Sequence, residues 1–132
     1  MDVELPRPTT VSATFRAAAR VIASNGHYQG GDYVPDPFDR EMCVPHFLRP
    51  MSIVAALKTA VTGDPHVDTA LANKAIEVLA LRLEVGGEMG PYYGDILSLE
   101  EHIAAWGDVP GRTAESVVAV LYAAADAVEV TA

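Results

Sequence analysis

Five segments of this chain carry apolar side chains at three- and four-residue spacing, and each is bounded by glycine, proline or a residue type that caps helices. This spacing places the apolar side chains on one face of a helix. The segments run from Thr10 to Gly26, Ser52 to Gly63, Asp64 to Gly86, Ser98 to Trp106 and Thr113 to Val128. The pattern predicts an all-α fold, a compact bundle of about five helices with one long irregular loop after the first.

Residues that begin and end helices set the expected boundaries. The expected starts are Thr9 or Thr10, Pro50 or Ser52, Asp64 with Pro65, Ser98, and Thr113. The expected stops include Gly26, Gly63 and the Gly86–Gly87 pair. Asp64 followed directly by Pro65 predicts that the third helix begins at once after the second. Ser98 with Glu101 three residues later forms a capping-box pattern, which predicts the start of the fourth helix there.

Two segments between the expected helices lack helical spacing. Residues 27–49 contain two glycines and three prolines, which permit unusual backbone angles or withhold a hydrogen-bond donor. Loops longer than about 12–15 residues in compact domains are commonly functional. This first loop is therefore the place to look for a site. Residues 86–97 form a second loop, and residues 1–8 an N-terminal arm, of a single domain that spans residues 1–132.

The charge balance disfavours several classes of partner. Nine basic residues against 18 acidic ones give a formal net charge of −9, which repels nucleic acids and anionic membranes. The longest apolar run, Val117 to Ala125, is far shorter than the roughly 20 residues that span a bilayer. A lone cysteine cannot form an internal disulfide, and the N-terminus lacks the pattern of a secretion signal. We therefore expect a protein of the cytoplasm.

The lone cysteine, Cys43, lies in the first loop at C-x-x-H spacing with His46. With His27 these residues are candidate metal ligands, because thiolate and imidazole bind zinc. Structural zinc sites usually have four ligands in two pairs, and only one pair is present here. Cys43 as a small buried apolar residue, or as a nucleophile activated by a histidine, are the alternatives. We assign no catalytic residue and no cofactor.

Aromatic side chains in and near the loops are candidate contacts for a partner. They are Tyr28 and Tyr33 in the first loop, Tyr92 and Tyr93 in the second, and Trp106 at the end of the fourth helix. Aromatic residues commonly anchor interfaces, but they equally pack on the body of a domain. For Trp106, packing of its helix against the core is the favoured interpretation. His66 and His102 stand without partners at metal-binding spacing, so we expect solvated or capping roles for both.

Three segments resemble a known family when they are taken in order: TFRAAARVIASNGHYQGG from Thr14, MCVPHFLRPMSIVAAL from Met42, and IAAWGDVPGRTAESVVAVLYAAADAV from Ile103. The resemblance is to small actinobacterial and phage-associated helical proteins classed only as a domain of unknown function. This chain has Trp106-Gly107-Asp108 where that family has Trp-Asn-Asp, and His27-Tyr28-Gln29-Gly30 near its Gly-Trp position. Pro45, His46 and Phe47 stand where the family is glycine-rich and small. The resemblance implies a shared helical fold and a shared importance of Cys43, Trp106 and Asp108, but no reaction.

Three functional hypotheses follow. The first is a small acidic interaction or regulatory module that binds another protein through its loops, a role compatible with a homo-oligomer. The alternative is an enzyme that depends on a metal or small ligand, with its site under the loop from His27 to Phe47. An acidic mimic of nucleic acid rests on net charge alone.

Overall fold

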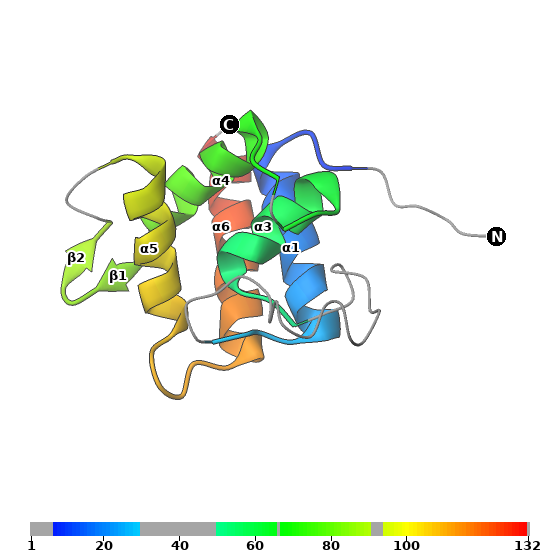
Figure 1. Ribbon diagram of the computed structural model, residues 1–132. Coiled ribbons are helices and arrows are strands. Elements are labelled where there is room, and N and C mark those ends of the chain that lie inside the picture. Colours follow the sequence, from blue (N-terminus) through cyan, green and yellow to red (C-terminus); the bar gives the residue numbers. More distant parts are fainter. Residues whose placement is uncertain (1–6, 30–49, 66, 91–93, 132) are drawn as a thin grey trace.

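The computed structural model describes residues 7–29, 50–65, 67–90 and 94–131, and across them the chain is an all-α bundle (Figure 1). Within these ranges it contains five helices and one small hairpin. The helices are α1 (Val11–Asn25), α3 (Ile53–Thr62), α4 (Ala70–Ala80), α5 (Ile96–Gly107) and α6 (Ala114–Thr131). The hairpin consists of β1 (Glu84–Val85) and β2 (Glu88–Met89). The predicted helical class and bundle are confirmed.

Local capping explains where the first two helices begin. The hydroxyl of Thr10 accepts a hydrogen bond from the Ala13 amide at 3.1 Å, and that of Ser52 accepts one from the Ala55 amide at 3.2 Å. These bonds satisfy backbone donors that have no partner inside the helix. At the other end of α3, Gly63 has a left-handed φ of 85°, which favours glycine. The predicted boundaries of α1 and α3 are therefore confirmed.

Helix α3 lies at the centre of the bundle and packs against α1, α4 and α5. Eight consecutive residues, Ile53 to Ala60, are buried. A helix that is apolar on most sides must be surrounded by other elements. Three of the eight are alanines, and small side chains allow helix axes to approach closely. The start of α3 is thereby held in the middle of the molecule.

Helices α1 and α6 form the most extensive pair in the bundle and lie side by side in Figure 1. Phe15, Ala18 and Ile22 of α1 are fully buried, as are Val117 and Leu121 of α6. Thr113 caps α6 as predicted, because its hydroxyl accepts a hydrogen bond from the Ser116 amide at 3.1 Å. At the far end of the pair, Arg16 forms ion pairs with Asp126 and Glu129. Two helices distant in sequence thus form one side of the bundle.

The prediction that the third helix begins directly at Asp64 and Pro65 is wrong. Helix α4 begins at Ala70, because Thr69 accepts a hydrogen bond from the Ala72 amide at 3.1 Å and so provides the cap. The backbone N–H and carbonyl of Asp64 instead bond the Thr62 hydroxyl, at 3.1 and 3.0 Å. These contacts hold the chain in a turn after α3 and delay the next helix.

Helix α4 also ends earlier than predicted, at Ala80. The Gly86–Gly87 pair, expected to stop the helix, has φ values of 59° and 87° and joins β1 to β2. Two successive residues with positive φ suit the two-residue turn of a hairpin. Part of the predicted second loop is therefore β2.

The start of α5 lies ahead of the predicted one. Asp95 caps the helix by accepting a hydrogen bond from the Ser98 amide at 3.2 Å, and the Ser98 hydroxyl donates to Asp95 at 2.7 Å. Both residues belong to types that cap helices, and the one earlier in the chain provides the cap.

Within the described part of the chain, none of the helices combines the length and apolar character that crossing a membrane requires.

Candidate functional site

The end of α1, the start of α3 and the end of α5 meet at one junction. Residues 26–28 run beside Met51: the Tyr28 amide donates to the Met51 carbonyl at 2.9 Å, and the Met51 amide donates to the Gly26 carbonyl at 3.3 Å. This short parallel bridge places His27 against the first turn of α3. Because α3 also packs against α5, the end of α5 reaches the same place.

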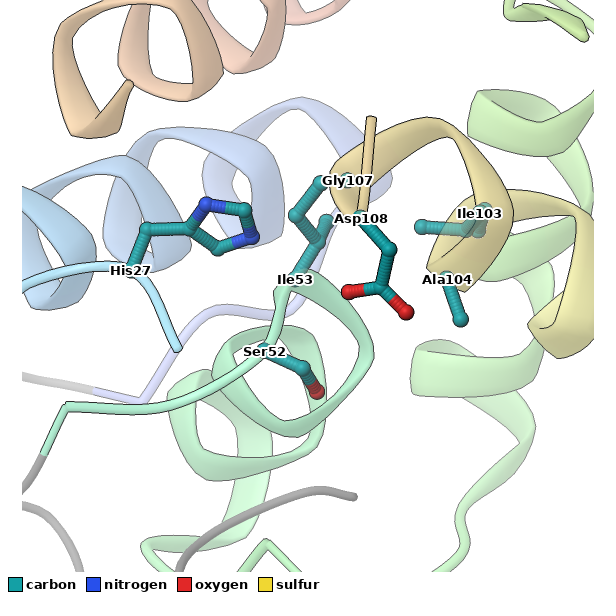
Figure 2. Close-up of a pocket in the computed structure, with 7 residues that line it drawn as sticks. All are labelled: His27, Ser52, Ile53, Ile103, Ala104, Gly107 and Asp108. Atoms are coloured by element: carbon teal, nitrogen blue, oxygen red, sulfur yellow. The ribbon is translucent and has the colours of Figure 1, made fainter. Parts of the chain in front are cut away.

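A surface hollow lies at this junction, and its free space of about 10 Å³ is enough for about one water molecule (Figure 2). The lining residues are His27, Ser52, Ile53, Ile103, Ala104, Gly107 and Asp108. We call it the His27 hollow. Figure 2 shows the His27 ring on one side and the Asp108 side chain, from the end of α5, on the other. The walls between them are mainly apolar, and the polar groups are one imidazole, one hydroxyl and one carboxylate.

His27 is half-buried, and its two ring nitrogens have different surroundings. Nδ1 is buried and has no hydrogen-bond partner among the described residues. Nε2 faces α5: a Cβ placed on Gly107 would lie 3.1 Å from it. Burial lowers the pKa of His27 below its ordinary value, an effect that Asp108 opposes and Arg112 reinforces. The imidazole is therefore mainly neutral at neutral pH.

Neighbouring side chains fix the end of α5 beside the hollow. The Gln29 side-chain amide donates to the carbonyls of Gly107 at 2.9 Å and Val109 at 3.2 Å. Arg112 donates to the Trp106 carbonyl at 3.0 Å, and its guanidinium lies 3.7 Å from the centre of the Trp106 ring. The carbonyls of Trp106 and Val109 also accept backbone hydrogen bonds, so these donors add side-chain links to the end of α5 and the turn after it. The cation–π contact adds to this restraint.

The candidate residues from the sequence fall into two groups. Cys43, His46, Tyr33, Tyr92 and Tyr93 lie outside the described residues, so their proposed roles stay predictions. His27, Tyr28 and Trp106 are described. The segments His27–Gln29 and Trp106–Asp108, which carry two of the departures from the resembled pattern, come together at the hollow.

Trp106 is buried, with 8% of its surface exposed, and its ring is covered on one face by Arg112. Tyr28 is half-buried beside the same junction. A partner contact by either residue stays a prediction. In the part of the chain that the structure describes, no three His, Cys, Asp or Glu side chains converge in a way that could hold a metal ion.

The sequence interpretation missed a buried ion pair between helices. Lys58 of α3 is 4% exposed, and its ammonium lies 3.3 Å from a Glu100 carboxylate oxygen of α5 and 2.8 Å from one of Asp68. The Glu100 side chain is 11% exposed, whereas Asp68 is at the surface. A lysine inside the mainly apolar run Ile53–Ala60 was the available sequence signal, because a buried lysine needs a partner.

His102, expected in a solvated or capping role, is not solvated. It is buried beside the hairpin, where its Nε2 accepts a hydrogen bond from the Gly90 amide at 3.1 Å and lies 2.6 Å from the Leu83 carbonyl oxygen. His102 thus links α5 to both ends of the hairpin. Its position on the face of α5 that carries Leu99, Ile103 and Trp106 was the sequence signal for burial.

Two large apolar side chains are exposed on the elements that flank the hairpin and the Tyr92–Tyr93 segment in the chain. Leu81, which follows α4, is 53% exposed, and Leu97 in the first turn of α5 is 67% exposed. Leu81 packs against Gly90, at which an added Cβ would lie 2.8 Å from the leucine methyl. Exposed apolar side chains of this size commonly serve as contacts when they form part of a patch.

Comparisons with known proteins give one family and no characterised relative. No curated protein and no solved structure matches the chain significantly. A family model, described as a family of unknown function, DUF6197, matches residues 6–127. The match covers nearly all of the chain, from the arm before α1 to the last turns of α6. The chain therefore belongs to the DUF6197 family of unknown function.

Proposed function

We propose that this protein is a small acidic recognition module of the cytoplasm that binds another, basic protein. An actinobacterial or phage-associated source, which the sequence resemblance implies, is part of the same proposal. The net charge of −9 supports a basic partner, because opposite charge accelerates encounter and disfavours acidic competitors. A homo-oligomer is compatible with the proposal but is not required by it.

The exposure of Leu97 and Leu81 carries this proposal. At 67% and 53% exposed, these leucines leave apolar surface in water that a partner could cover. They flank in sequence the segment that contains Tyr92 and Tyr93, which we expect to add aromatic contacts. A contact surface that combines apolar and aromatic side chains within an acidic rim is typical of protein recognition.

The enzyme alternative has less support from the site. Pockets for small molecules commonly enclose roughly 300–1,000 Å³, whereas the free space in the His27 hollow is about 10 Å³. Such a space holds about one water molecule and is too small for a substrate. An enzyme would further require Cys43 and His46 to converge with His27, and these two residues lie outside the described part of the chain.

Photo-crosslinking in the cells that express the protein tests the recognition function. A photoreactive p-benzoylphenylalanine replaces Leu97 in one variant, Leu81 in a second, and Ala23, an exposed residue of α1, in a matched control. We expect one discrete adduct with a basic protein from the two leucine positions and none from Ala23. Sedimentation of the purified chain measures whether the chain self-associates, which shows whether an adduct with a second copy is to be expected.

Equal adduct yields from all three positions, or adducts with acidic proteins only, would contradict the proposal. Once a partner is identified, Leu97→Lys gives a quantitative check. This change removes apolar surface and places a positive charge toward a basic partner, so we expect binding to weaken about tenfold or more.

A further inference from the structure

Asn25, the last residue of α1, is followed by Gly26, and this pair of residues can be modified without an enzyme. An asparagine side chain reacts with the backbone nitrogen of the next residue, and glycine hinders the ring closure least because it has no side chain. The chain contains two asparagines, and the other, Asn73, precedes Lys74 inside α4. Asn25 is therefore the asparagine whose sequence context favours deamidation.

The reaction requires only hydroxide and water. The Gly26 nitrogen loses its proton to hydroxide and attacks Cγ of Asn25. The bond from Cγ to the side-chain nitrogen then breaks, and that nitrogen takes a proton from water and leaves as ammonia. Water opens the resulting succinimide ring: cleavage at Cγ gives aspartate, and cleavage at the main-chain carbonyl carbon gives isoaspartate. In isoaspartate the main chain runs through the side-chain methylene, so it is longer by one carbon.

In the folded chain, the attacking nitrogen is engaged in a hydrogen bond. The Gly26 N–H donates to the Ile22 carbonyl at 2.8 Å, as the last backbone bond of α1. The Gly26 carbonyl accepts from the Met51 amide at 3.3 Å, which holds the same residue from its other side. Gly26 also has a φ of 101°, a backbone angle that favours glycine. Ring closure at Asn25 therefore requires the last turn of α1 to open.

Gln29 restrains this segment a few residues further along the chain. Its side-chain amide donates to the carbonyls of Gly107 at 2.9 Å and Val109 at 3.2 Å, which links residues 26–29 to the end of α5. Helix ends open locally at a much lower free energy than the whole protein needs for unfolding. The frequency of opening is thus set by the backbone bonds of Gly26 and by the contacts of Gln29.

We propose that Asn25–Gly26 is a deamidation site that becomes reactive only when the last turn of α1 opens and separates from Met51. This inference goes beyond the recognition function and does not depend on it. The new carboxylate lies at the C-terminal end of α1, where the helix dipole disfavours negative charge. The extra carbon of isoaspartate also changes the register in which Gly26 and Tyr28 pair with Met51. Deamidation therefore loosens the junction that positions His27.

Ageing of the purified chain in mildly alkaline buffer, followed by mass spectrometry of its peptides, tests the proposal. The exchange of ammonia for water identifies the modified peptide by its mass, and Asn73 is the internal reference. We expect deamidation at Asn25 in the urea-unfolded chain. In the folded chain the rate should be at least about tenfold lower, which corresponds to a local opening free energy of about 1.4 kcal/mol or more.

Gln29→Ala and Arg16→Ala form a matched pair of variants. Each removes a side chain that links the α1 region to another helix, but Arg16 pairs with Asp126 and Glu129 and lies earlier in α1. We expect Gln29→Ala to accelerate deamidation about fivefold, equivalent to about 1 kcal/mol of lost restraint. Arg16→Ala should stay near the parent rate. Urea unfolding of both variants separates local opening from a loss of global stability.

The proposal is overturned if Asn25 deamidates as fast in the folded chain as in the unfolded chain, or if it stays intact in both. It is also overturned if Gln29→Ala ages like the parent. The same holds if Gln29→Ala and Arg16→Ala give equal rates at equal global stability, because local opening at Gly26 would then not control the reaction. These results involve no partner, so they are independent of the crosslinking experiment.

Discussion

At the scale of single residues, the protonation of His27 has a direct consequence for the fold. Its Nδ1 has no acceptor among the described residues, and burial lowers the pKa of the ring. The charged groups known to influence it are Asp108, which favours the protonated ring, and Arg112, which disfavours it. Burial is the largest of these effects, so the folded protein binds a proton at His27 less readily than the unfolded chain does.

We predict that stability decreases as the pH falls below about 6.5, the ordinary value for histidine. Below that pH the unfolded chain gains a proton that folded His27 resists, so unfolding becomes more favourable. The effect is absent above that value and reaches its full size below the lowered pKa of the folded state. Urea unfolding at several pH values between 5 and 7.5 measures it, with His27→Asn as the reference.

The difference between the parent and His27→Asn isolates this histidine from the other three. We expect the parent to lose more stability than the variant on acidification. Asp95 and Glu129, whose pKa values are lowered by hydrogen bonds from Ser98 and from Ser12 with Arg16, lose their contributions only in the more acidic range where carboxylates titrate. Parallel curves for the two proteins from pH 7.5 to 5 would contradict the prediction.

The sequence could indicate His27 but not its surroundings. A histidine at the start of a long loop is a reasonable candidate, and the metal role proposed for it depends on Cys43 and His46, outside the described residues. The contacts that define the hollow join residues about 80 positions apart, as in the bond from Gln29 to Val109. Such contacts depend on how helices pack, which local spacing does not encode.

At the scale of the elements, the buried ion pair between Lys58 and Glu100 joins α3 to α5. A buried pair contributes little net stability when complete, but removing one partner leaves a charge in apolar surroundings. Asp68 shares the ammonium from the exposed side. The junction of the two helices at the hollow therefore depends on charges in the core as well as on apolar packing.

We predict that Lys58→Met lowers the free energy of unfolding by about 3–5 kcal/mol, because the nearly buried Glu100 carboxylate loses its ion pair with the Lys58 ammonium. The double variant Lys58→Met with Glu100→Gln should recover at least half of that loss. Chemical denaturation of both variants measures the coupling between the two residues.

Lys74→Met is the matched control, since its ion pair with Glu77 at 3.3 Å is exposed, with side chains 58% and 48% accessible. Exposed pairs contribute about 0–1 kcal/mol, so this variant should stay close to the parent. A similar loss of unfolding free energy from Lys58→Met and Lys74→Met would contradict the prediction, because burial of the Lys58 ion pair would then add nothing to the cost of breaking it.

Helix boundaries were predictable where a single local cap decides them. Thr10, Ser52 and Thr113 lie directly before apolar stripes, and each caps the expected helix. Where a second capping residue lies nearby, the predicted start was wrong: Thr69 caps α4 instead of Asp64, and Asp95 caps α5 instead of Ser98. The outcome then depends on hydrogen bonds such as the two between Thr62 and Asp64, which form only when the turn after α3 is in place.

At the scale of the whole molecule, the excess of acidic residues affects the stability of the isolated domain. With 18 acidic and nine basic residues, the folded state concentrates like charges that are farther apart in the unfolded chain. The described ion pairs at the surface are few, chiefly Arg16 with Asp126 and Glu129, and Lys74 with Glu77. Repulsion should therefore outweigh attraction among the exposed charges at low ionic strength.

We predict that added salt raises the melting temperature of this protein. Raising the ionic strength from 0.01 to 0.1 M shortens the screening length from about 30 to about 10 Å, which removes most long-range repulsion and leaves close pairs partly intact. Each kcal/mol of repulsion relieved corresponds to about 4 °C for a domain of this size.

Glu84→Lys with Glu101→Lys changes two exposed positions and takes the net charge from −9 to −5, because each reversal adds two charges. This variant should melt higher than the parent at low salt and respond less to added salt. If salt lowers the melting temperature of the parent, the surface ion pairs stabilise the domain more than the charge excess destabilises it, and the acidic surface would then be better explained by partner recognition alone.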